Sequence, residues 1–294
     1  MVDIPLAEVV AMGNRAKREG VGDILDLCTI SNAKSGRCAE DCRFCAQSSR
    51  HATSSPEYPL KQRSELLAEA RKAKEIGSGR FCIVTSGNAI SDSEIDSICA
   101  ATEEIIGEVG IKVCGSLGRV SRNGLAKLKK AGMSRFHHNI ETSPAYYPQV
   151  VSTHTMDDRI QTLRDAKEAG MQTCSGGIIG MGESWEDRID MAFLLRDLGA
   201  DSIPLNVLVP IPGTPMGNRE PLSASDAIRT VAIFRIIMPD RTIKLAAGRE
   251  SVLKDFQAMA YMAGANGMII GGYLTIRGRS IEEDQKLIAE LRHT

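Results

Sequence analysis

Short apolar segments alternate with helix-like segments along almost the whole 294-residue chain, and this alternation limits the folds open to it. Each apolar segment is rich in β-branched residues and usually closes at Gly, Asn or Ser, as buried strands do. Eight such segments follow residue 20: ILDLCTIS, RFCIVTSG, KVCGSLG, RFHHNIE, QTCSGGIIG, SIPLNVLVP, TIKLAAGR and GMIIGGYL. Eight strand–helix units predict an α/β fold, a (β/α)8 barrel of the TIM type with parallel strands.

Helical patterns separate these strands, and several of them open with Ser or Asp and end at Gly. They cover residues 59–77, 91–109, 156–170 and 280–293, and another helix is predicted near residues 5–19. A single barrel fits this length, and no repeat or long linker indicates a second domain. We therefore predict one domain over residues 1–294, with an N-terminal helix in 1–20 and the barrel in 21–294. That helix would either cover the barrel bottom or contact a partner subunit.

The charge balance indicates a small-molecule partner. The 36 basic and 37 acidic residues nearly cancel, and no long run of one sign favours nucleic acid or a membrane surface. No stretch approaches about 18 consecutive apolar residues, and the N-terminal segment contains acidic residues and lacks the order of a signal peptide. We therefore expect a cytoplasmic protein, in which the eight cysteines are metal ligands or reactive groups rather than disulfides.

The segment SGRCAEDCRFCAQSS, residues 35–49, places Cys38, Cys42 and Cys45 in a Cys-x3-Cys-x2-Cys run. It follows the first strand, at the mouth where barrel enzymes place their chemistry. A structural zinc site needs four ligands, and only His51 stands nearby as a fourth. Three thiolates instead suit a [4Fe-4S] cluster that leaves one iron open to a substrate.

A second group of cysteines lies inside the predicted strands. Each could be a small buried hydrophobe. Their joint placement instead indicates a shared site, because barrel side chains from alternate strands lie in common layers. Cys28, Cys114 and Cys174 fall on strands one, three and five, Arg249 on strand seven, and Cys82 on strand two beside them. We predict a second iron–sulfur cluster there. Cys99 lies on a helix and is interpreted as packing.

The opening motif, at this place in a barrel, resembles that of the radical S-adenosylmethionine enzymes. This resemblance implies a [4Fe-4S] cluster whose open iron binds S-adenosylmethionine and whose electron cleaves it to a 5′-deoxyadenosyl radical. On the same resemblance Phe44, next to Cys45, is the aromatic residue that lies near the adenine.

Within that superfamily the chain resembles the biotin synthases over nearly its whole length. The similar segments are SGRCAEDCRFCAQSSRH, GRFCIVTSG, HHNIETSPAYYPQVVSTHT, TCSGGIIGMGE, LNVLVPIPGTP and LAAGRE followed by QAMAYMAGAN, in the family's order. The resemblance implies a sulfurtransferase that converts dethiobiotin to biotin, in which two adenosyl radicals remove hydrogen from saturated carbons and an auxiliary cluster donates sulfur. It further implies a flavodoxin- or ferredoxin-type electron donor and a homodimer. The alternatives are another radical enzyme of this subfamily, such as a metallocofactor maturase, and a non-enzymatic iron–sulfur carrier.

The resemblance assigns Cys82, Cys114, Cys174 and Arg249 to the auxiliary cluster. Cys28 departs from the better-known pattern, because serine is expected there when that cluster is [2Fe-2S]. Four thiolates are the usual complement of a [4Fe-4S] cluster, which we favour, with or without an extra sulfide, and Arg249 would then offset its charge from outside the ligand sphere. In the other interpretation Cys28 is a bystander to a [2Fe-2S] cluster held by three cysteines and Arg249.

Several polar residues match the family's cofactor and substrate positions. Asn139 and Glu141 are expected near the ribose and the substrate, and Asn206 near the ureido ring, although without the resemblance each could simply cap a helix or a turn. Gly177 and Gly180 could let the backbone approach the adenosine. His137 and His138 alternate along a strand, so at most one should face inward, and His138 is interpreted as a packing or hydrogen-bonding residue. Tyr146 and Tyr147 are also interpreted as packing.

Overall fold

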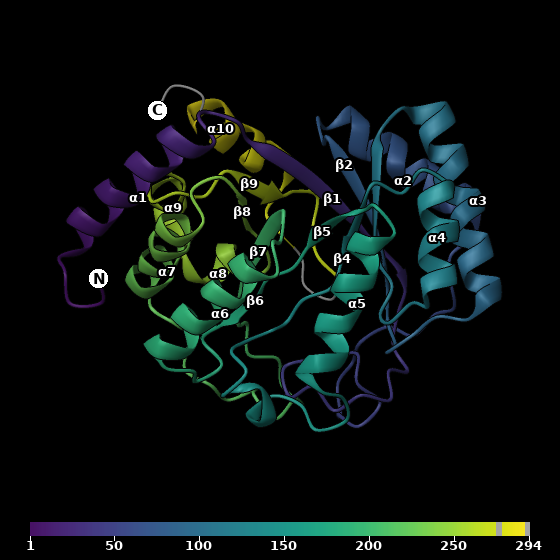
Figure 1. Ribbon diagram of the computed structural model, residues 1–294, viewed down its shortest axis with the longest axis horizontal. Helices are drawn as coiled ribbons and strands as arrows, with labels where there is room; N and C mark the ends of the chain where they lie inside the picture. Colours follow the sequence, from purple (N-terminus) through teal and green to yellow (C-terminus); the bar gives the residue numbers. More distant parts are fainter. Residues whose placement is uncertain (275–277, 292–294) are drawn as a thin grey trace.

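The strands form a closed barrel in the computed structural model, which describes residues 1–274 and 278–291 (Figure 1). The strands are β1 (Asp26–Lys34), β2 (Arg80–Thr85), β3 (Lys112–Ser116), β4 (Arg135–His137), β5 (Gln172–Cys174), β6 (Gly177–Ile179), β7 (Ser202–Val207), β8 (Thr242–Leu245) and β9 (Gly267–Ile269). The helices are α1 (Leu6–Gly20), α2 (Arg63–Glu75), α3 (Asp92–Val109), α4 (Arg122–Lys130), α5 (Met156–Glu168), α6 (Trp185–Asp197), α7 (Ala224–Ile237), α8 (Arg249–Val252), α9 (Gln257–Met262) and α10 (Ile281–Leu291), with short 3-10 turns at Tyr147–Gln149 and Lys254–Phe256.

Eight parallel strands close the barrel. Strands β1 to β5 pair in sequence, β7 to β9 follow, β9 pairs with β1, and β5 meets β7 where Cys174 stands opposite Ser202. Strand β6 is an extra strand that pairs with β7 alone among the named strands of the described part. The predicted TIM-type barrel is confirmed.

Three predicted strands are shorter than expected. The fifth breaks into β5 and β6 at Gly176, where an added Cβ would lie 1.9 Å from the carbonyl oxygen of Pro204. The fourth ends at His137 and the seventh at Leu245, so residues beyond those points do not follow strand alternation. These early ends change which side chains reach the barrel interior.

Helix starts follow the capping chemistry expected from the sequence. Ser91, Thr155 and Ser184 each accept the backbone N–H of the third helical residue, whose carboxylate accepts the cap's own N–H in return. Ser121 and Ser223 cap α4 and α7 with their side chains alone, by accepting the backbone N–H of the third helical residue. The predicted helix at 280–293 is observed as α10, and residues 292–294 lie outside the described residues.

Helices surround the strands on both sides (Figure 1). Helices α2, α3 and α4 lie on one side, and α1, α6, α7 and α9 lie on the other. Helix α1 packs against α7 and α9, and a Cβ added at Gly13 would lie 2.1 Å from the carbonyl oxygen of Ala263. The N-terminal helix therefore covers helices of its own chain. None of the helices within residues 1–274 and 278–291 is long and apolar enough to cross a membrane.

Candidate active site

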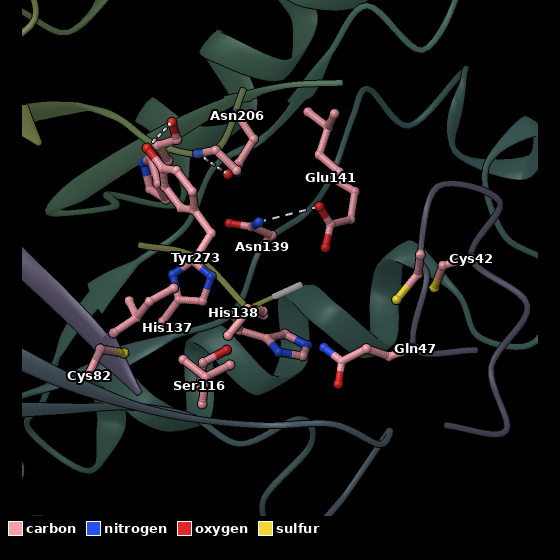
Figure 2. Close-up of a pocket in the computed structure, with 18 of the residues that line it drawn as sticks. Cys42, Gln47, Cys82, Ser116, His137, His138, Asn139, Glu141, Asn206 and Tyr273 are labelled. Carbon is pink, nitrogen blue, oxygen red and sulfur yellow. Dashed lines mark hydrogen bonds between the residues drawn. The ribbon is translucent and has the colours of Figure 1, made fainter. Parts of the chain in front are cut away.

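A cavity of about 390 Å³ runs from the barrel interior to the loops that follow the strands. Alternate residues of the strands line its inner part, including Cys28 and Ile30 of β1 and Cys82 and Val84 of β2. Figure 2 shows Cys42 and Cys82 on opposite sides of this pocket, with His137, His138 and Asn139 between them. Both groups of cysteines therefore face a single space.

The outer cysteines lie on the loop after β1, and all three line the cavity. Pairing of Cys38 with Ser48 folds the loop back on itself, and the Cys45 amide donates to the carbonyl oxygen of Cys42 at 2.9 Å. Burial raises the pKa of Cys45 to about 11 and raises the pKa of Cys42 further. The Cys42 and Cys45 thiols are therefore protonated at neutral pH unless a metal compensates the charge of the thiolates.

The inner cysteines form a buried layer on four strands, and Cys28, Cys82, Cys114 and Cys174 are each at most 8 % exposed. Cys82 of β2 stands opposite Cys114 of β3. A hydrogen bond with Cys114 and burial raise the pKa of the Cys28 thiol, and burial raises that of Cys114. Cys28 thus belongs to the same thiol layer as the three strand cysteines that the sequence grouped.

The cysteine chemistry fits iron–sulfur clusters better than a single metal ion. Within the described ranges, no three Cys, His, Asp or Glu side chains converge closely enough to hold one ion. A cluster distributes its thiolates over several irons, so its ligands need not meet at one point. Four buried thiols inside the barrel and three at its mouth could serve as donor sets for two such clusters.

Three cations that the sequence analysis missed line the cavity beside the inner cysteines: Arg80, Arg135 and Lys244. Asp26 is their carboxylate partner, at 3.3 Å from Arg135 and 3.5 Å from Lys244. Burial opposes the charge of Lys244, but Cys28 and Asp26 outweigh it and raise its pKa. The inner layer therefore lies in positive surroundings that suit an anionic group.

The prediction that Arg249 lies on strand seven is wrong. Strand β8 ends at Leu245, the chain turns at Gly248 with φ +86°, and Arg249 begins α8. Its guanidinium donates to the Asp284 carboxylate at 2.7 Å and to the Tyr273 hydroxyl at 3.1 Å, and it is absent from the described residues that line the cavity. The residue of that strand that faces the cysteine layer is Lys244.

Asn139 and Glu141 line the cavity close to each other. The Asn139 amide donates to Glu141 Oε2 at 3.3 Å, drawn as a dashed line in Figure 2, and Arg159 lies 3.4 Å from Glu141 Oε1. Glu141 has φ +69°, a backbone conformation that is strained for any residue other than glycine, and such strain clusters at functional sites. Phe44 lines the same cavity.

The remaining predicted contact residues have structural partners. Asn206 lines the cavity, but its amide donates to the Gly177 carbonyl and accepts from the Ala247 amide, each at 3.2 Å. Gly177 and Gly180 do not line the cavity among the described residues, whereas Ile178 between them does. A Cβ at Gly177 would lie 2.4 Å from the Glu141 carbonyl oxygen, so close backbone packing accounts for this glycine.

Both His137 and His138 face the cavity, so the expectation that only one does is wrong. Strand β4 ends at His137, and alternation therefore no longer directs His138 outward. Burial lowers the pKa of His137 to about 4 and also lowers that of His138. His137 Nδ1 lies 3.3 Å from Cys174 Sγ.

Tyr147 and His154 form a contact at the mouth that sequence reasoning did not find. The Tyr147 hydroxyl lies 2.7 Å from His154 Nδ1, and the other ring nitrogen of His154 lies 3.6 Å from Cys42 Sγ. Burial lowers the pKa of His154 to about 4. Tyr146, in contrast, donates only to the Met181 carbonyl among its described hydroxyl partners, as a packing residue would.

Two family models match the chain. Residues 33–195 match the radical SAM superfamily, and residues 204–293 match the biotin and thiamin synthesis associated domain. The first match alone covers more than half of the chain and includes the outer cysteine loop.

Curated relatives match over almost the whole chain. The biotin synthase of Thermotoga neapolitana is 48% identical over 91% of this chain and 96% of that protein. The biotin synthase of Pelotomaculum thermopropionicum is 43% identical over 98% of this chain and 89% of that protein.

Solved structures support the fold. The crystal structure of methylornithine synthase has a TM-score of 0.82 at 18% identity, covering 97% of this chain and 88% of that chain. The FeFe-hydrogenase maturase HydG from Carboxydothermus hydrogenoformans has a TM-score of 0.80 at 20% identity, covering 97% and 71%. At these identities only the architecture is shared, whereas the sequence matches are specific: the chain belongs to the biotin synthase family of radical S-adenosylmethionine enzymes.

Proposed function

We propose that this chain converts dethiobiotin to biotin by inserting sulfur at the expense of S-adenosylmethionine. The observation that carries this proposal is the shared cavity, which three loop cysteines line at its mouth and four strand cysteines line inside the barrel. A radical reaction of this kind needs a substrate held between the radical source and the sulfur donor. One enclosed space between two thiol sets meets that requirement.

The outer site would hold the radical-generating cluster on Cys38, Cys42 and Cys45. When it is bound, such a cluster supplies an open iron for S-adenosylmethionine and the electron that cleaves it. Glu141 and Asn139 offer a carboxylate and an amide for ribose hydroxyls or ureido N–H groups, and Phe44 offers an aromatic face for the adenine. Ile178, Val207 and Leu208 add apolar side chains to the cavity wall, which suits a reaction that must be shielded from water.

For the inner site we propose a [4Fe-4S] auxiliary cluster, with or without an extra sulfide, held by Cys28, Cys82, Cys114 and Cys174. Two observations support four cysteine ligands: Cys28 is buried in one cluster with Cys82 and Cys114, and the Arg249 guanidinium is bonded to Asp284. Lys244 then provides the positive charge that we first expected from Arg249. Asn206 would contact the substrate only with atoms left free by its two backbone bonds.

We further propose a cytoplasmic homodimer that receives electrons from a flavodoxin- or ferredoxin-type donor. These proposals rest on the family alone. The other reaction class, maturation of a metal cofactor, is disfavoured because it requires no converging Cys28, Cys82 and Cys114.

The proposal is tested with anaerobically reconstituted, iron-57-enriched protein that receives S-adenosylmethionine, dethiobiotin and reductant. We expect 5′-deoxyadenosine and biotin to accumulate while the Mössbauer signal of one four-iron population decays. Cys28→Ser should reduce that population, whereas Cys99→Ser, a half-buried cysteine on α3, serves as the matched control. If a two-iron component decays instead, and its amount is the same in Cys28→Ser, Cys28 is a bystander. Absence of any second cluster would refute the proposed activity.

A further inference from the structure

His137 lies against an inner cysteine because two neighbouring strands end side by side. It is the last residue of β4 and stands directly opposite Cys174, the last residue of β5. Opposite residues of paired parallel strands point to the same face of the sheet, and both of these side chains line the cavity. His137 Nδ1 lies 3.3 Å from Cys174 Sγ. The strand register itself therefore places the imidazole on the inner cysteine layer.

The rest of the imidazole faces the cavity. His137 is half-buried and lines the cavity, and Figure 2 shows its ring between Cys82 and Asn139. Among the described residues no hydrogen bond reaches Nε2, whereas Nδ1 has Cys174 as its partner. The ring thus has one nitrogen on the cysteine layer and one without a partner in the described part of the chain.

The hydrogens of this ring can be assigned by chemistry. Burial lowers the pKa of His137 despite the nearby charge of Glu141, so the neutral ring has one hydrogen to place. A metal-bound Cys174 is a thiolate and can only accept, so that hydrogen lies on Nδ1. Nε2 then carries a lone pair and is an acceptor. Within residues 1–274 and 278–291 no arginine or lysine donates to either nitrogen, so no protein donor contradicts this assignment.

The amides that are expected near the substrate already accept hydrogen bonds from the protein. Asn139 Oδ1 accepts the Gly176 amide at 3.1 Å, and Asn206 Oδ1 accepts the Ala247 amide at 3.2 Å. The cyclic urea of dethiobiotin carries two N–H donors, and each nitrogen is two bonds from a carbon that receives sulfur. An acceptor beside the inner cysteines therefore suits this group.

We propose that His137 links the inner site to the substrate: Nδ1–H donates to the Cys174 thiolate, and Nε2 accepts a ureido N–H of dethiobiotin. One rigid imidazole then sets the distance between the cyclic urea and the sulfur-donor ligands, so the carbons that lose hydrogen lie within reach of the sulfur. His137 is thus a substrate-binding residue that selects for the N–H, because a buried acceptor left unpaired penalises analogues without it. The inference rests on the proposed function, since it requires the inner cluster and a cyclic urea as substrate.

The test measures binding of radiolabelled dethiobiotin to the cluster-loaded protein by equilibrium dialysis, with S-adenosylmethionine present and reductant absent so that no radical forms. His137→Phe removes both ring nitrogens and should weaken binding about tenfold. His137→Gln places an amide where Nε2 stands and should bind within about threefold of the unsubstituted protein. His137→Asn, whose amide stands where Nδ1 does, should bind as weakly as His137→Phe. The two amide variants are therefore matched controls for each other.

The midpoint potential of the inner cluster should rank the amide variants in the reverse order. Hydrogen bonds to cluster sulfurs favour the reduced cluster. His137→Phe and His137→Gln lack the donor to Cys174, so the reduction equilibrium constant should fall about tenfold, a shift of about 59 mV to more negative potential for one electron. His137→Asn should stay near the unsubstituted protein. A merely structural role would move both measurements together in all three variants.

Two oxazolidinone analogues of dethiobiotin, each with one ureido N–H replaced by oxygen, check which group Nε2 accepts. One of them should bind the unsubstituted protein about tenfold more weakly than dethiobiotin does, and this difference should shrink in His137→Phe. Equal dethiobiotin affinities of His137→Phe and the unsubstituted protein, or analogue affinities equal to that of dethiobiotin, would overturn the inference. If His137→Phe does not load the inner cluster, equal affinities of the two amide variants would overturn it as well. Failure of the proposed function is separate, because the unsubstituted protein would then bind no dethiobiotin.

Discussion

The two cysteine groups are built in opposite ways. The outer three lie within eight residues of one loop, whereas the inner four come from β1, β2, β3 and β5 and meet only because the barrel closes. The outer loop depends on distant segments to hold it, through Asp41 with residues 152 and 153. The inner layer is held by the strand ladder itself.

Their electrostatic surroundings also differ. The inner layer has Arg80, Arg135 and Lys244 around one carboxylate, that of Asp26. The outer loop has Glu40 and Glu141 in the same cavity, and the charge of Arg159, which also lines it, lowers the pKa of Cys42. A site that must hold a highly anionic group gains from the first arrangement, and a site that must bind a substrate with mixed charges gains from the second.

The largest expected effect distinguishes the outer from the inner cysteines by which product is lost, 5′-deoxyadenosine or biotin. Cys42→Ala should abolish both 5′-deoxyadenosine and biotin, because the outer site starts the reaction. Cys114→Ala should lower biotin formation by at least about 100-fold while 5′-deoxyadenosine still forms, since only the sulfur donor is affected. Both products are measured by mass spectrometry after one anaerobic incubation. Equal loss of both products in Cys114→Ala, with the outer cluster loaded, would contradict the division of labour.

A smaller effect tests whether Arg249 belongs to the inner site or to the framework. Arg249 and Asp284 are each about 2 % exposed, and they join α8 to α10. Arg249→Leu leaves the Asp284 charge buried and unpaired, so the free energy of unfolding should fall by about 3–5 kcal/mol.

The double variant Arg249→Leu/Asp284→Leu should recover most of this loss, because neither charge remains. Urea denaturation of the apoprotein measures both variants without any cluster. A stability equal to that of the unsubstituted protein in Arg249→Leu, together with loss of inner-cluster iron, would return Arg249 to the ligand set.

Much of this organisation could be predicted from the sequence. Apolar strands with β-branched residues predicted the barrel, and Cys38, Cys42 and Cys45 marked the outer site because their spacing is local. The inner cysteines were found because strand alternation and layering act over short, regular distances. The local cysteine spacing and the strand pattern can both be recognised without knowing the conformation of the loops.

The errors arose where strands end. Arg249 was assigned to a strand that stops four residues earlier, and His138 to one that stops at His137. Turns such as Gly248, with positive φ, decide these ends through contacts that the sequence does not display. Lys244 could have been found, because a lone lysine inside an apolar strand must face either solvent or a charged interior. His154 could not, since its place depends on the bonds of Asp41 to a distant segment.

The smallest effect concerns a feature that the two regions share, a histidine against a thiol. His137 lies by Cys174 and His154 by Cys42, and burial lowers the pKa of each to about 4. In the unfolded chain a histidine titrates near 6.5. Below that pH the unfolded state binds more protons than the folded state, so stability is full above about pH 6.5 and falls as the pH drops toward 4.

Each histidine should contribute at most about 1.4 kcal/mol per pH unit in this window. Urea denaturation of the apoprotein from pH 7 to 4.5 measures the slope, and His137→Gln and His154→Gln should each reduce it. His138, whose pKa burial also lowers, stays in both variants as a common background. A larger reduction in His137→Gln would mean that the inner thiol layer excludes water more completely than the mouth. Equal reductions would mean that the fastened outer loop shields its histidine as well as the barrel does, and an unchanged slope in both variants would contradict the burial of neutral histidines at either site.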